Sequence, residues 1–133
     1  MALVAVEELL LEEDLEFLRQ KAFSFDADRV NAFVHVIIRG YQLPAGLYTP
    51  AATDLLIRLP ANYPLLHPDM FWMFPAVRLG NGNYPDRADQ FETFGDRQWQ
   101  RWSRHMDAKN WRPSVDRLQA YLATIRRDLS KGL

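Results

Sequence analysis

A proline-rich turn between two strand-like segments does most to limit what this sequence can fold into. The turn runs from Tyr63 to Pro68 and reads Tyr-Pro-Leu-Leu-His-Pro. Residues 53–60 before it alternate apolar and polar types, and residues 70–74 after it are apolar and aromatic. Proline fixes φ and has no amide hydrogen, so Pro64 and Pro68 cannot continue a strand inside a sheet. The sequence therefore predicts two strands joined by a rigid connection.

Four further segments complete the expected order. Residues 31–42 predict a strand, because β-branched and aromatic types are dense there. Apolar side chains recur at helical spacing over residues 7–21 and 115–129, and the second helix is expected to begin at Ser114 and end before Gly132. Residues 79–110 are rich in Gly, Asn and Pro, which predicts a long irregular segment. This order predicts one α+β domain over residues 1–133, with helices covering one face of an antiparallel meander.

The composition excludes several classes of protein. Sixteen basic and seventeen acidic side chains give a formal charge of −1, without the basic excess of nucleic-acid-binding proteins. No apolar run approaches the roughly 18 residues of a membrane span, and the first residues lack the pattern of a secretory signal. The sequence has no cysteine, and His35, His67 and His105 lack the spacing of metal ligands. We expect a cytoplasmic protein without metal, cofactor, nucleic acid or membrane partner.

The motifs together resemble the ubiquitin-conjugating (UBC) superfamily over almost the whole chain. Tyr63, Pro64 and Pro68 match three positions of that family's Tyr-Pro-x-x-Pro-Pro turn, with His67 in place of the first paired proline. Residues 111–113, Trp-Arg-Pro, match its Trp-x-Pro motif before a helix. The resemblance implies an N-terminal helix, an antiparallel four-stranded meander, a long active-site loop and a C-terminal helix.

A bacterial branch of the superfamily is more similar still. Residues 68–71, Pro-Asp-Met-Phe, and residues 99–105, Trp-Gln-Arg-Trp-Ser-Arg-His, look like the conjugating-enzyme-like proteins of bacterial ubiquitin-like systems. The resemblance implies partners of two kinds, a ubiquitin-like or multi-ubiquitin-like protein and a ThiF-type activating enzyme, in pathways that also contain JAB-type peptidases. The first helix is acidic, whereas the matching eukaryotic helix tends to be basic where it meets the activating enzyme.

Ser103 is the candidate catalytic residue. The family's catalytic cysteine lies eight residues before the Trp of Trp-x-Pro, and this count leads from Trp111 to Ser103. A serine nucleophile needs a base, and His105 would share a face with Ser103 if the segment is extended. The alternatives are a structural serine in a packed loop, a hydrogen-bonded loop histidine, or an engineered cysteine-to-serine change. The family's His-Pro-Asn motif is not recognisable here, since the available Asn81 and Asn83 have different neighbours.

Other residues are candidate contacts with a partner. Arg101 and Arg104 flank Ser103 and could bind a carboxylate or an acidic tail, unless they are merely solvated. The remaining candidates belong to the Tyr63–Pro68 turn or to the long loop, although large aromatic side chains more often fill a core. They are Tyr63, His67, Asn81, Asn83 and Trp102.

Three functions agree with this pattern. The first is a conjugating-enzyme-like binding platform that holds the ubiquitin-like protein or its activating enzyme noncovalently. The second is an active transferase that uses Ser103, or a native cysteine at that position. The third is a structural interaction domain of the related RWD type.

Overall fold

The computed structural model describes residues 5–133, so residues 1–4 of the expected 1–133 domain lie outside the description. Two helices, α1 (Val6–Leu9) and α2 (Glu12–Gln20), precede the strands, and α3 (Leu118–Leu129) follows them. A short 3-10 helix, η1 (Ala108–Asn110), lies between the last strand and α3. Within residues 5–133, no helix is long and apolar enough to span a bilayer.

Six antiparallel strands form the main sheet, in the order β1-β2-β4-β5-β8-β7. They are β1 (Ser24–Val30), β2 (Phe33–Gln42), β4 (Ala52–Leu59), β5 (Phe71–Phe74), β7 (Gln90–Phe94) and β8 (Arg97–Trp102). A second, two-stranded sheet pairs β3 (Tyr48–Thr49) with β6 (Arg78–Leu79). The α+β class, with a mostly antiparallel sheet and helices toward the ends of the chain, is confirmed. The strands β1-β2-β4-β5 form a four-stranded antiparallel meander, and the β8–β7 hairpin adds two strands to it that the prediction did not include.

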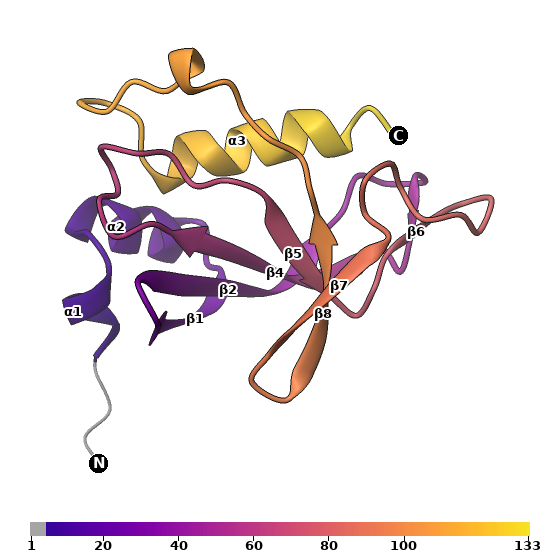
Figure 1. Cartoon of the computed structure of the whole chain (residues 1–133), viewed down its shortest axis with the longest axis horizontal. Coiled ribbons are helices and arrows are strands. Elements are labelled where there is room, and N and C mark those ends of the chain that lie inside the picture. The colour runs from indigo at the N-terminus through magenta and orange to yellow at the C-terminus, as the bar shows by residue number, and fades with distance from the viewer. Residues whose placement is uncertain (1–4) are drawn as a thin grey trace.

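Helices α2 and α3 lie on one face of the sheet (Figure 1). The main core forms between them, and its fully buried side chains include Leu18 of α2, Ile125 of α3, and Ile38, Ile57 and Met73 of the sheet. Burying such apolar side chains stabilises the fold by about 1.5–3 kcal/mol each. We call this face of the sheet the inner face.

The opposite, outer face of the sheet is strongly curved. His35 on β2 and Phe94 on β7 are separated by three strands in the sheet, which in a flat sheet would place them about 19 Å apart. Their ring centroids are only 5.0 Å apart. The β7–β8 hairpin therefore bends across the outer face, where Leu56, Trp72 and Trp99 form a second small core.

Both predicted helices differ from the observed ones near their N-terminal ends. The first is divided, because Leu10 and Leu11 have extended backbone and the bend buries Leu10. Helix α3 begins at Leu118, so Ser114 is not its cap and Val115 stays exposed. The Asp14 carboxylate of α2 accepts the Leu118 amide hydrogen at 3.1 Å instead. A cap supplied from a distant part of the chain cannot be predicted from local sequence.

A buried amide fixes β8 beside the loops that precede it. The Gln100 side chain is fully buried, and its Oε1 accepts hydrogen bonds from the Val77 amide at 2.7 Å and from Trp102 Nε1 at 3.3 Å. Its Nε2 donates to the carbonyl oxygens of Val77 and Ala88 at 2.9 and 2.8 Å. Residues 79–110, expected to be irregular, thus contain an ordered hairpin tied to the core.

Candidate functional site

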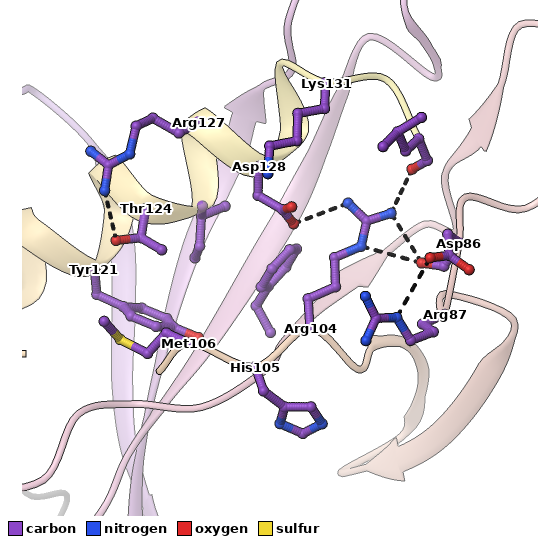
Figure 2. Close-up of a pocket in the computed structure, with 13 residues that line it drawn as sticks. Asp86, Arg87, Arg104, His105, Met106, Tyr121, Thr124, Arg127, Asp128 and Lys131 are labelled. Atoms are coloured by element: carbon purple, nitrogen blue, oxygen red, sulfur yellow. Dashed lines mark hydrogen bonds and ion pairs between the residues drawn. The ribbon is translucent and has the colours of Figure 1, made fainter. Parts of the chain in front are cut away.

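A pocket of about 390 Å³ lies between α3 and the segment that leaves β8. His105 and Met106 of that segment line one side, and Tyr121 and Arg127 of α3 line another (Figure 2). We call this hollow the Arg127 pocket. Four arginine and lysine side chains and two aspartates take part in its lining, so it carries a formal excess of positive charge. A cleft of one sign of charge favours a ligand of the other sign, here an anion.

Arg104 forms part of the pocket wall. Its Nη1 lies 3.0 Å from Asp128 Oδ2, and its Nε and Nη2 donate to the Asp86 carbonyl oxygen at 3.2 and 3.0 Å. A further hydrogen bond reaches the Leu133 carbonyl oxygen, and the guanidinium lies over the Trp102 ring. The side chain is only 9% exposed. Arg104 is thus engaged within the chain, which argues against the expected role as a carboxylate ligand.

Three other cations are available to a ligand. Arg87 lies 3.5 Å from Asp86 Oδ2, but both side chains are more than half exposed, and such ion pairs contribute little. Among the described residues, Arg127 donates a side-chain hydrogen bond only to Thr124 Oγ1, at 3.2 Å. Within residues 5–133, neither Arg127 nor Lys131 forms an ion pair. The anion-binding capacity of the pocket therefore rests on Arg87, Arg127 and Lys131.

His105 is held in place by a carboxylate. Its Nδ1 lies 2.7 Å from Asp69 Oδ2, which leaves Nε2 as the free ring nitrogen. Asp69 is followed by Met70, whose φ of 60° is rare for a residue other than glycine. The Met70 carbonyl oxygen accepts a 2.6 Å hydrogen bond from the buried Tyr121 hydroxyl of α3. Helix α3 thus fixes the backbone that presents Asp69 to His105, and an imidazole oriented in this way is suited to accept a proton.

Ser103 and His105 have different hydrogen-bond partners. Its Oγ accepts a hydrogen bond from Arg101 Nε at 3.0 Å, and its amide donates to the Arg87 carbonyl oxygen at 2.9 Å. Arg101 also pairs with Glu92 at 3.1 Å, on the outer face of the sheet. Ser103 does not line the Arg127 pocket. The structure therefore brings Ser103 together with Arg101, and the predicted pair of Ser103 and His105 shares no hydrogen bond.

Trp102 belongs to the core. It is fully buried and stacks on Phe71, with ring centroids 5.4 Å apart. The candidate role as a surface contact is wrong for this residue, because no part of it reaches solvent. The alternative interpretation, a large aromatic side chain that fills the core, describes its position.

The Tyr63–Pro68 turn is fixed by polar contacts. The Tyr63 hydroxyl donates to Asp14 Oδ2 at 2.7 Å, and His67 Nδ1 donates to the Pro68 carbonyl oxygen. Trp111 Nε1 donates to the Pro64 carbonyl oxygen at 2.9 Å, so the Trp-x-Pro motif packs against this turn. Burial raises the pKa of Tyr63 and, despite its hydrogen bonds, that of Asp14. Tyr63 and His67 are half-buried and lie outside the Arg127 pocket.

Asn81 and Asn83 form an exposed turn after β6. Asn81 Oδ1 accepts the Asn83 amide hydrogen at 2.9 Å, a bond typical of asparagine turns. Neither residue lines the pocket. Their placement gives no reason to assign them to oxyanion binding.

Sequence reasoning missed the residues that shape the Arg127 pocket. Asp69 belongs to the Pro-Asp-Met-Phe motif of residues 68–71, but it is paired with His105, which is 36 residues away in the sequence. Local sequence does not indicate such a pairing. Arg127 and Lys131 are four residues apart, the spacing that puts two helical side chains on one face, and this signal was available. Arg87 has no distinguishing neighbour in the sequence. Within residues 5–133, no three histidine or acidic side chains gather as a metal site.

A known protein family matches nearly the whole chain. A family model described as prokaryotic E2 family E matches residues 10–132. No curated protein and no solved structure matches the chain significantly. The E2 proteins are the ubiquitin-conjugating proteins, so the match supports the resemblance to a bacterial E2-like family. Since it covers nearly all of the 133 residues, the chain belongs to prokaryotic E2 family E.

Proposed function

We propose that the chain is a noncovalent binding platform in a bacterial ubiquitin-like conjugation pathway, where it holds the ubiquitin-like protein or its ThiF-type activating enzyme. Its family supports a component of the ubiquitin-conjugation type. The observation that carries the noncovalent role is the absence of cysteine from the sequence. E2 transfer depends on a thiolate, which is far more nucleophilic near neutral pH than a serine hydroxyl.

The environment of Ser103 supports the same conclusion. Its Oγ is bound by a guanidinium, which can donate hydrogen bonds but cannot accept the proton that a nucleophilic hydroxyl must lose. The imidazole that could accept that proton shares no hydrogen bond with Ser103. A contact surface without a working nucleophile is the function that this arrangement favours.

The Arg127 pocket is the proposed contact region. It lies beside residues 104–106, which follow Ser103, the position that corresponds to the family's cysteine. Arg87, Arg127 and Lys131 of the pocket offer positive charge to an acidic or carboxylate-bearing part of the partner. The Tyr63–Pro68 turn and the exposed part of residues 81–110 are further candidate contacts. The long-range attraction of such cations acts mainly on the rate and specificity of association.

Calorimetry tests this proposal without ATP. The wild-type chain is titrated with a ubiquitin-like protein, and separately with a ThiF-type activating enzyme, from the same organism. We expect binding to at least one of them, and we expect Arg127→Glu combined with Lys131→Glu to weaken it about tenfold or more. Arg126→Glu is the matched control, because Arg126 is the neighbour of Arg127 on α3 but does not line the pocket. Absence of binding to both proteins would contradict the proposal and favour an RWD-type structural domain.

One observation favours a second candidate, a transferase that uses Ser103. The Asp69–His105 pair has the geometry of an oriented general base. In this reaction Ser103 Oγ would attack the activated carbonyl carbon of the ubiquitin-like protein, its proton would pass to His105 Nε2, and the activating group would leave. The step requires the Ser103 side chain to leave Arg101 and turn toward His105.

A further inference from the structure

A groove between α2 and α3 is separate from the Arg127 pocket. It consists of two hollows of about 570 and 460 Å³, one beside the C-terminal end of α2 and one beside the start of α3. Phe17, Gln119 and Ala123 line both hollows, so the two adjoin one another along α2 and α3. Both helices lie on the inner face of the sheet (Figure 1), and we call this feature the α2–α3 groove.

The floor of the α2–α3 groove is apolar. Phe17 meets Phe23 edge to face with ring centroids 6.3 Å apart, and Phe23 lies 6.4 Å from Tyr41. Both phenylalanines are only partly buried. Ala120 and Ala123 of α3 add short side chains in the middle of the groove, where another helix can approach closely. Apolar floors that remain accessible are common at sites of protein association.

One end of the groove is basic. Lys21, Arg39 and Arg126 line the first hollow, and no acidic side chain lines it. Arg39 pairs with Asp26, whereas in the described part of the chain the Arg126 side chain donates only to the Gln42 carbonyl oxygen, at 3.4 Å. Within residues 5–133, Lys21 forms no ion pair. Two cations are thus left without an acidic partner beside an apolar floor, in a chain whose formal charge is −1.

The other end of the groove is close to neutral. Glu13 pairs with Arg117 at 3.3 Å and Asp116 with Arg112 at 2.9 Å, and buried Asp14 is held by Tyr63 and Leu118. The nearby Val115 side chain is 58% exposed and extends the apolar surface at this end. A complementary partner therefore needs acidic groups at one end only, with apolar side chains along the rest.

We propose that the α2–α3 groove binds an amphipathic helix of a partner protein, with acidic residues in its first turn over Lys21 and Arg126. A helix suits the two helical walls of the groove, because the backbone groups of α2 and α3 are already bonded within those helices and offer no ladder to a strand. Acidic residues in a first turn also suit the helix dipole. This surface does not depend on the proposed function at the Arg127 pocket.

Two synthetic helices of about 18 residues test the proposal, a length at which isolated helices begin to be stable. Both carry the same stripe of leucine and phenylalanine, and only the first turn differs, with glutamates in one peptide and lysines in the other. Fluorescence anisotropy with the full chain should show saturable binding of the acidic peptide, at least about tenfold tighter than the basic one. Equal affinities, or no binding of the acidic peptide, would overturn the proposal.

Neighbouring variants locate the binding. Arg126→Glu should lower the affinity for the acidic peptide at least about fivefold. Arg127→Glu, which alters the adjacent residue in the Arg127 pocket, should leave that affinity unchanged. Ala123→Gln, which places a longer side chain in the middle of the groove, should also weaken it. In the calorimetric test, the substitution at Arg127 should weaken binding and Arg126→Glu should not, whereas in the peptide test Arg126→Glu should weaken binding and Arg127→Glu should not. Failure of one proposal is therefore distinguishable from failure of the other. If sedimentation shows a dimer that Ala123→Gln dissociates, the occupant is a second copy and the proposal is wrong.

Discussion

His35 makes the stability of the fold depend on pH. It is 5% exposed on the outer face, beside the Phe94 ring and near Arg58. Burial, reinforced by the positive charge of Arg58 and opposed by Asp28, lowers the pKa of His35 from 6.5 to about 4. The imidazole is therefore neutral in the folded chain throughout the range in which a free histidine becomes charged.

The unfolded chain binds a proton at His35 near pH 6.5, while the folded chain does so only near pH 4. The free energy of unfolding should accordingly fall as the pH is lowered from about 6.5 to about 4, by up to about 3 kcal/mol, and this contribution should not change further below that range. Urea unfolding at several pH values measures it. The His35→Gln variant should show a shallower pH dependence. Identical slopes in the two proteins would rule out this role for His35.

At the scale of elements, Gln100 determines how the β7–β8 hairpin joins the core. Replacing Gln100 with leucine leaves the Val77 amide, two carbonyl oxygens and the Trp102 ring nitrogen without this partner. We expect a loss of about 2–4 kcal/mol in the free energy of unfolding, because buried polar groups that lose their hydrogen bonds are costly. Denaturant unfolding measures the loss.

The matched control for this prediction is Gln98→Leu, the same substitution on the same strand at an exposed position. It should change the free energy of unfolding by no more than about 0.5 kcal/mol. An equal effect of the two substitutions would mean that the amide of Gln100 contributes nothing beyond the packing of its side chain.

Elements with strong local signals were predictable from the sequence. The strands over residues 31–42, 53–60 and 70–74 were placed correctly to within a few residues, since β-branched and aromatic types are concentrated there. Strand β1 was missed because it is a polar edge strand whose side chains are mostly exposed or half-buried. The β7–β8 hairpin was also missed, although Gly95-Asp96 between two alternating segments is a hairpin signal, and Gly95 has the positive φ of 64° that such turns need.

The candidate site was predictable only in part, because its geometry depends on distant partners. Counting from Trp111 located the segment that borders the Arg127 pocket, and His105 does line that pocket. The directions of the side chains followed from contacts that local sequence does not encode. Ser103 is drawn to Arg101 on the outer face, and His105 is drawn to Asp69, which Tyr121 of α3 holds in place through Met70.

At the scale of the whole molecule, we propose that this E2-family chain is a surface that binds partners without forming a covalent bond. The two regions proposed for that role are the Arg127 pocket beside residues 104–106 and the α2–α3 groove. They share no lining residue, although Arg126 of the groove and Arg127 of the pocket are neighbours on α3.

Mass spectrometry of a complete reaction distinguishes noncovalent binding from covalent transfer. The chain is incubated with the ubiquitin-like protein, the activating enzyme and ATP, and then measured under native and under denaturing conditions, beside Ser103→Ala. For the wild-type chain and for Ser103→Ala, we expect a native complex with the summed mass of the chain and its partner, which separates into unmodified chains on denaturation. A hydroxide-labile species that survives denaturation with the summed mass less one water, and that is missing from Ser103→Ala, would contradict this expectation.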